Sequence, residues 1–211
     1  MTTRTITTLV AAAATAVTIS AALGGCGSTA TPPASSSASS SQVAQEHNQA
    51  DITFAQGMIP HHTQAIAMSQ MAAQRAALPQ VKDLAARIQS AQEPEIDQLS
   101  GLLRAWNASM PSADNPTVHR RHDSPGQPDH GDGGAMPGMM SADQMRQVGQ
   151  ASGDAFDRMF LQMMIVHHRG AVTMAQDELS DGKNAEARQL AQRIIDAQQR
   201  EITKMQALLG G

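Results

Sequence analysis

The chain has 211 residues, of which 16% are charged and 2% are aromatic, and its formal net charge is −4. This length suits one domain of ordinary size with additional tails, and the acidic balance argues against a basic face for binding nucleic acid. Ala, Gln, Met and Leu dominate positions 45–209 and Tyr is absent. Because most of these residues favour helices, the composition predicts an all-α fold.

The first 25 residues are typical of a secretory signal peptide. Arg4 supplies a positive charge, and the apolar stretch Leu9–Val17 is too short to span a bilayer. The residues from Leu23 to Cys26 then resemble a bacterial lipobox, in which the cysteine receives lipid. Cys26 is the only cysteine, so a disulfide within the chain is impossible. We therefore predict a lipoprotein carrying palmitate at Cys26 on the extracytoplasmic face of the cell membrane. The alternative is an ordinary cleaved signal with an incidental cysteine.

Residues 26–42 are rich in Ser, Ala, Thr and Pro, a low-complexity composition that cannot bury a core. They are predicted to be a flexible, disordered tether between the lipid anchor and the folded part. The fold itself is predicted to occupy residues 43–211.

The folded part contains an internal repeat. The stretch Asp51–Met68 returns as Asp157–Met174, 106 positions later, and the same offset relates Glu95 to Glu201 in the following segment. A constant offset without gaps indicates duplication. The predicted parts are a first repeat at about 45–107, a linker at 108–140 and a second repeat at about 141–209.

Apolar residues recur at helical spacing in four segments. The predicted helices are 43–77, 80–107, 141–179 and 184–209. Short turns join them in pairs, and each resulting αα-hairpin is too thin to bury its own apolar stripe. The two hairpins are therefore expected to form a four-helix bundle with pseudo-twofold symmetry, whose parallel or antiparallel packing the pattern leaves open.

The linker is rich in Pro, Gly and Asp, a composition that predicts disorder. It also carries His119, His122 and His130, followed by the methionine-rich stretch Met136–Met140. Thioether and imidazole groups suit soft metals, so a loose metal-acquisition site is the alternative interpretation.

Polar residues are predicted to share one layer at the middle of the bundle. At 100° per residue the motif of the first repeat covers an arc of about 120°, the width of a core-facing stripe. His62 and Glu95 lie equally far from the first turn, and His168 and Glu201 equally far from the second. Each hairpin is thus expected to place one histidine and one inward glutamate at the same level.

Methionine accompanies the histidines in both copies. Met58 precedes His61 by three residues and His62 by four, so the three side chains can reach one site. Asp51 lies about 16 Å away along the helix and cannot share it. The candidate metal ligands are Met58, His61, His62, Met164, His167 and His168. The candidates for orienting them, or for replacing them as ligands, are Asp51, Met68, Glu95, Asp157, Met174 and Glu201.

Three functional hypotheses follow, and none assigns a catalytic residue. Thioether and imidazole ligands favour a copper ion, particularly Cu(I), and hence copper sequestration or handling. An iron or manganese oxidoreductase using the carboxylates and histidines is an alternative, although the chain has no Glu-x-x-His motif of the kind that di-iron bundles use. The third is a metal-free interaction or structural bundle whose polar layer fixes helix register.

The motif D-x-x-F-x-x-x-M-I-x-H-H-x-x-A-x-x-M, followed by A-x-R-I-x-x-A-Q-x-x-E-I, resembles the bacterial secreted family called domain of unknown function 305. The resemblance extends from about Glu46 to Leu209 apart from the linker. It implies a ferritin-like helical bundle, often duplicated, and some members are similar to copper-binding proteins of the cell envelope. The expected partners are therefore a metal ion and the membrane.

Overall fold

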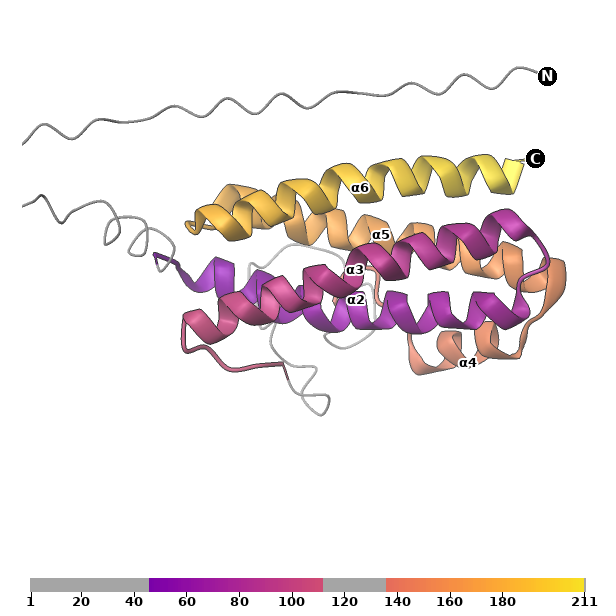
Figure 1. Cartoon of the computed structure of the whole chain (residues 1–211), viewed down its shortest axis with the longest axis horizontal. Helices are drawn as coiled ribbons and strands as arrows, with labels where there is room; N and C mark the ends of the chain where they lie inside the picture. The colour runs from indigo at the N-terminus through magenta and orange to yellow at the C-terminus, as the bar shows by residue number, and fades with distance from the viewer. Residues whose placement is uncertain (1–45, 112–135, 211) are drawn as a thin grey trace, which may run out of the picture. The chain divides into compact units, whose positions relative to one another are not determined.

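A computed structural model describes residues 46–111 and 136–210, so the predicted signal peptide, the tether and most of the linker lie outside it. The described residues form helices and no strand, which confirms the all-α prediction (Figure 1). None of these helices is long and apolar enough to cross a bilayer. The helices are α2 (Gln49–Arg75), α3 (Pro79–Ala105), α4 (Ala142–Gln150), α5 (Gly153–Asp181) and α6 (Ala185–Gly210).

Local sequence signals explain where the long helices begin. The Asn48 side chain accepts hydrogen bonds from the first-turn amides of α2, and the Asp51 side chain accepts one from the Asn48 N–H, which completes a capping box. Pro79 occupies the first turn of α3, where its missing N–H costs nothing. The Asn184 side chain accepts the amides of Glu186 and Ala187 at the start of α6.

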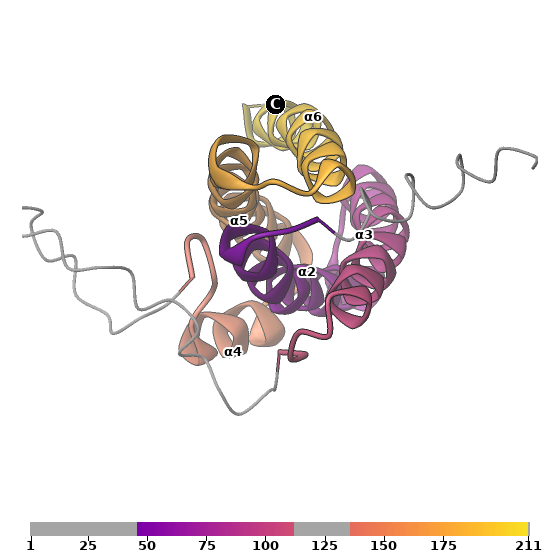
Figure 2. The same ribbon diagram turned by 90° about the vertical axis from the view of Figure 1, so that its left-hand side faces the viewer.

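The single helix predicted at 141–179 is wrong, because the segment forms two helices. Ser141 caps the short helix α4 by accepting the Gln144 N–H at 3.2 Å, and α4 ends at Gln150. Gly153, with a φ of 61°, then redirects the chain into α5. The break lets α4 fold back against α2 and α5, outside the four long helices (Figure 2).

The end of the predicted disordered linker is also part of the packed structure. Met140 is buried, and both its backbone N–H and its carbonyl bind the side chain of Gln64 in α2, at 2.7 and 2.8 Å. Residues 136–140 therefore pack against the bundle, contrary to the disorder that their composition predicted.

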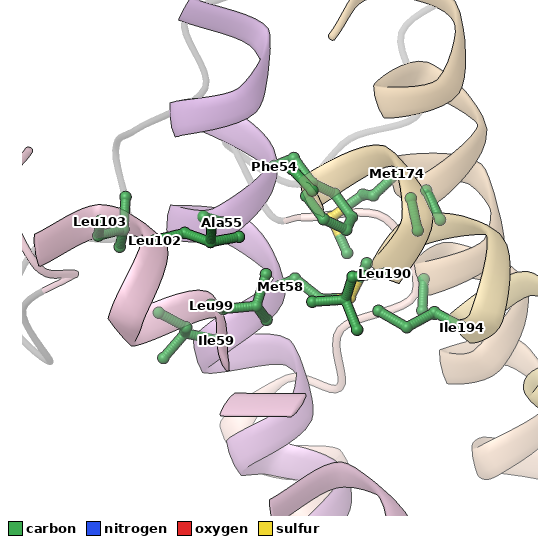
Figure 3. Close-up of a cluster of buried hydrophobic side chains, with 14 of the residues drawn as sticks. Phe54, Ala55, Met58, Ile59, Leu99, Leu102, Leu103, Met174, Leu190 and Ile194 are labelled. Atoms are coloured by element: carbon green, nitrogen blue, oxygen red, sulfur yellow. The ribbon is translucent and has the colours of Figure 1, made fainter. Parts of the chain in front are cut away.

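The two hairpins pack with α2 antiparallel to α5. The N-terminal half of α2 shares one hydrophobic cluster with the C-terminal half of α5, where Phe54, Met58 and Met174 meet Leu190 of α6 (Figure 3). The C-terminal half of α2 shares a second cluster with the N-terminal half of α5. The four long helices α2, α3, α5 and α6 thus surround both clusters, in the bundle arrangement predicted from the sequence (Figure 2).

Candidate metal centre

A layer of histidines separates the two hydrophobic clusters. On α2, the first cluster ends at Ile59 and the second begins at Ala65. On α5, the second cluster ends at Ile165 and the first resumes at Ala171. The gap on each helix holds a pair of adjacent histidines, and all four side chains are buried. They are His61, His62, His167 and His168.

Each repeat contributes one histidine–glutamate pair to this layer. His62 donates through Nε2 to Glu95 Oε2 at 2.8 Å, and His168 donates to Glu201 Oε2 at 2.7 Å. Both histidines are fully buried, whereas the glutamate side chains are 18% exposed. A carboxylate that accepts one ring N–H fixes the orientation of the imidazole and leaves its Nδ1 facing the core.

His61 and His167 meet where the two repeats join. Their ring centroids lie 3.7 Å apart, with the ring planes tilted by 36°. Burial, reinforced by neighbouring imidazoles, lowers the pKa of His61 to about 3 and holds the pKa of His167 well below its ordinary value. Both rings are therefore neutral at physiological pH, the state in which imidazole binds a metal.

Five buried imidazole nitrogens have no hydrogen-bond partner among the described residues. They are Nδ1 of His61, His62, His167 and His168, and Nε2 of His167. Buried polar atoms normally have a hydrogen-bond partner, so these nitrogens are available to a water molecule or to a metal ion. In the described parts of the chain, however, no three His, Cys, Asp or Glu side chains lie ready to hold one ion together. A metal site here therefore needs another donor, or a rearrangement of these rings.

The methionine thioethers of α2 and α5 are further candidate donors, because two of them lie close to the histidine pairs along these helices. Met58 and Met164 are fully buried, one in each hydrophobic cluster, and each precedes its histidine pair by about one helical turn. Met68 and Met174 are also buried, but each lies six residues beyond the second histidine of its pair, about 9 Å along the helix. The structure thus flanks the histidine layer with Met58 and Met164.

The two candidate aspartates lie at opposite ends of the bundle. Asp51 accepts the amides of Lys183 and Asn184, and Asp157 accepts those of Ala77 and Leu78. Each aspartate therefore holds the turn of the other repeat and is separated from the histidine layer.

Gln92 and Gln198 are polar core residues that the sequence interpretation did not single out. They are 2% and 3% exposed, and they precede Glu95 and Glu201 by three residues, one helical turn. Both amide atoms of Gln92, and Oε1 of Gln198, lack a partner among the described residues. The signal that could have identified them is their recurrence at the repeat offset, on the same helix face as the glutamates.

The comparisons with known proteins agree on one family. The family model described as domain of unknown function (DUF305) matches residues 51–209. A DUF305 protein of Streptomyces coelicolor, described as secreted, is 30% identical with a TM-score of 0.65, over 76% of this chain and 92% of that one. A DUF305 fragment from Deinococcus radiodurans is 28% identical with a TM-score of 0.62, over 77% and 97%.

A third similar structure is a metal complex. CopM in its Cu(II)-bound form is 31% identical with a TM-score of 0.60, over 76% of this chain and 95% of that one. CopM structures in Cu(I)-bound and Ag-bound forms are similar to this chain as well. The comparison with curated proteins gave no match.

Proposed function

This chain belongs to the DUF305 family, and we propose that it binds copper, as Cu(I), in the histidine layer between its two hydrophobic clusters. The observation that carries the proposal is the group of unpartnered imidazole nitrogens buried at mid-bundle. Nitrogen lone pairs next to thioethers form a donor set suited to soft copper rather than to hard ions. The CopM structures with copper and silver support the same chemistry.

The proposed ligands come symmetrically from α2 and α5: Met58, His61 and His62 from one repeat, and Met164, His167 and His168 from the other. Glu95 and Glu201 accept the Nε2 protons of His62 and His168 and so keep the other ring nitrogens available. Copper is cargo in this proposal. A site buried among apolar side chains suits sequestration or transfer better than turnover of a dissolved substrate.

We propose further that the chain acts outside the cytoplasmic membrane, attached by lipid at Cys26. This residue lies outside the described part of the structure, and the argument rests on the signal-like sequence before it. The similar Streptomyces coelicolor protein, described as secreted, supports an extracytoplasmic location.

The test compares soft and hard metals on matched variants. Ag(I) or Cu(I) at a hundredfold excess over its Kd should stabilise the native chain by about 2.7 kcal/mol, which a thermal melt detects easily. Met58→Leu with Met164→Leu conserves volume and apolarity, and it should weaken Ag(I) binding without large loss of stability. The control, Met71→Leu with Met205→Leu, changes two other core-packed methionines and should leave Ag(I) affinity unchanged.

The iron or manganese alternative predicts the opposite pattern. Glu95→Gln with Glu201→Gln would then abolish stabilisation by Mn(II) or Fe(II), while the methionine variants would bind these ions normally. Absence of stabilisation by Cu(I), Ag(I), Fe(II), Mn(II) and Zn(II) alike would contradict both metal hypotheses. The polar layer would then serve only to fix helix register.

A further inference from the structure

The segment Met136–Met140, here called the strap, crosses from α5 to α2 over the histidine layer. Its Pro137 carbonyl accepts a hydrogen bond from His61 Nε2 at 3.0 Å. Its far end is held by the Gln64 side chain, which bonds both the N–H and the carbonyl of Met140. Three hydrogen bonds thus fix the strap against α2.

Two glycines allow the strap to lie against α5. Gly138 has a φ of 77°, and a Cβ at this position would lie 2.7 Å from the Val166 carbonyl oxygen. A Cβ on Gly170 would lie 1.9 Å from the Pro137 oxygen, the atom that binds His61. Substitution of either glycine would therefore displace the strap from its present position.

The strap breaks the symmetry of the two repeats. The position equivalent to Gly170 in the first repeat, 106 residues earlier, is Gln64, the residue that anchors Met140. His61 consequently has a strap carbonyl as the partner of its Nε2, whereas no strap carbonyl pairs with the equivalent His167, and neither of its ring nitrogens makes a hydrogen bond of normal geometry with the described residues. The duplicated motif therefore presents two chemically different histidines where the rings meet.

The partner of His61 determines its tautomer. A backbone carbonyl only accepts hydrogen bonds, so the Nε2 that binds it must carry the proton. A neutral imidazole, the form that binds a metal, has one N–H, which the Pro137 carbonyl places on Nε2. Its Nδ1 is then a lone pair facing the core, the same state that the glutamates favour in His62 and His168.

We propose that Pro137 is a positioning residue: its carbonyl fixes His61 in the Nε2–H tautomer and so reserves Nδ1 for binding Cu(I). The assignment of the ligand atom rests on the proposed copper function, whereas the tautomer exists in the metal-free chain. Ligating histidines generally donate their second ring N–H to such a carbonyl or carboxylate, and loss of that partner typically costs about 10–100-fold in metal affinity. The Pro137 carbonyl therefore orients the ring of His61 in the same way that the Glu95 carboxylate orients the ring of His62.

The experiment uses Gly170→Ala, which crowds the Pro137 carbonyl, with Gly101→Ala as the control. Gly101 also lies inside a helix, so both substitutions give the same gain in helix propensity. A Cβ on Gly101 meets nothing within 4 Å, so the control variant creates no steric contact. In long-range ¹H–¹⁵N spectra of the metal-free protein, His61 should be a single Nε2–H tautomer in the parent and the control. In Gly170→Ala it should become a mixture, and the Kd for Ag(I) should rise about 10–100-fold. His62 and His168 should not change.

The outcomes separate this inference from the proposed function. An Nδ1–H tautomer of His61 in the parent overturns the inference directly. Unchanged Ag(I) affinity in a variant whose His61 tautomer has changed also overturns it, while copper binding stands. A parent that does not bind Ag(I) contradicts the proposed function itself. If Gly170→Ala does not fold, Gln64→Ala releases the Met140 end of the strap from α2 without crowding α5, and the same two measurements apply.

Discussion

The carboxylate of Asp51 accepts a hydrogen bond from the backbone N–H of Asn184 at 2.8 Å, and so ties the first helix of one repeat to the turn of the other. Asp157 makes the equivalent contact in the other direction, by accepting a hydrogen bond from the N–H of Leu78 in the turn of the first repeat, also at 2.8 Å. The duplicated aspartates are thus a reciprocal clamp between the hairpins. This role explains why an aspartate recurs in each copy although it is too distant to bind with the histidines.

We predict that Asp51→Asn and Asp157→Asn each destabilise the fold by about 1.5–3 kcal/mol, the usual range for hydrogen bonds to a charged group. Affinity for Ag(I) should not change, because neither aspartate reaches the histidine layer. Chemical denaturation and metal titration measure the two effects separately. The control, Asp143→Asn, alters an exposed aspartate and should be nearly neutral. Lost metal affinity at unchanged stability would show that the aspartates are ligands after all.

Glu178 lies beside this clamp without a symmetry mate, since the equivalent position in the first repeat is Ala72. It is 1% exposed. Burial, together with the nearby charge of Asp51, raises the pKa of Glu178 from 4.5 to about 9. Burial alone would raise the pKa of Asp51, but hydrogen bonds from the backbone of Asn48, Asn184 and Lys183 lower it below its usual value. Glu178 is therefore protonated beside an ionised Asp51 at neutral pH.

This raised pKa predicts a loss of stability at alkaline pH. The folded chain keeps a proton that the unfolded chain releases above pH 4.5, so the stabilisation is complete below that value and is lost as the pH rises through about 9. Glu178→Gln keeps the shape and the neutral state, and its melting temperature should fall less than that of the parent between about pH 7 and pH 9. The surface variant Glu93→Gln should behave like the parent. Parallel pH profiles for the parent and Glu178→Gln would contradict the assignment.

The proposed lipid anchor makes a cellular prediction. Cys26→Ser removes the thiol that receives the lipid, so the protein should leave the membrane fraction or accumulate as uncleaved precursor. Fractionation followed by mass measurement of the mature protein distinguishes these products. Membrane association and mass equal to those of the parent, apart from the single-atom substitution, would rule out lipidation at Cys26.

Much of the bundle could be predicted from the sequence because its determinants are periodic and local. The 106-residue offset located both hairpins, and equal distances from the turns placed His62 level with Glu95 and His168 level with Glu201. The direction of packing could not be predicted, since His62 lies near the middle of its helix. Either orientation would have brought the two histidine pairs together.

The strap and the separate helix α4 escaped prediction for a different reason. Residues 136–140 have no apolar period, and they are ordered by tertiary contacts with Gln64 and Gly170 on two different helices. One signal was visible in the sequence: Gly170 lies inside a predicted helix, whereas the equivalent residue of the first repeat is Gln64. A glycine at such a position indicates that another part of the backbone packs closely against the helix. The sequence also could not predict that amide atoms of Gln92 and Gln198 lack hydrogen-bond partners among the described residues, because this depends on how the side chains pack.

The location of bound copper tests the central claim most directly. A crystal of the full folded domain loaded with Cu(I) should give an anomalous scattering peak at the copper edge within the histidine layer, between Met58 and Met164 and next to His61 and His167. The same crystal of Met58→Leu with Met164→Leu should show a weaker peak or none. A peak only at the protein surface or at the Asp51 clamp, or no peak in the parent under saturating Cu(I), would contradict the account.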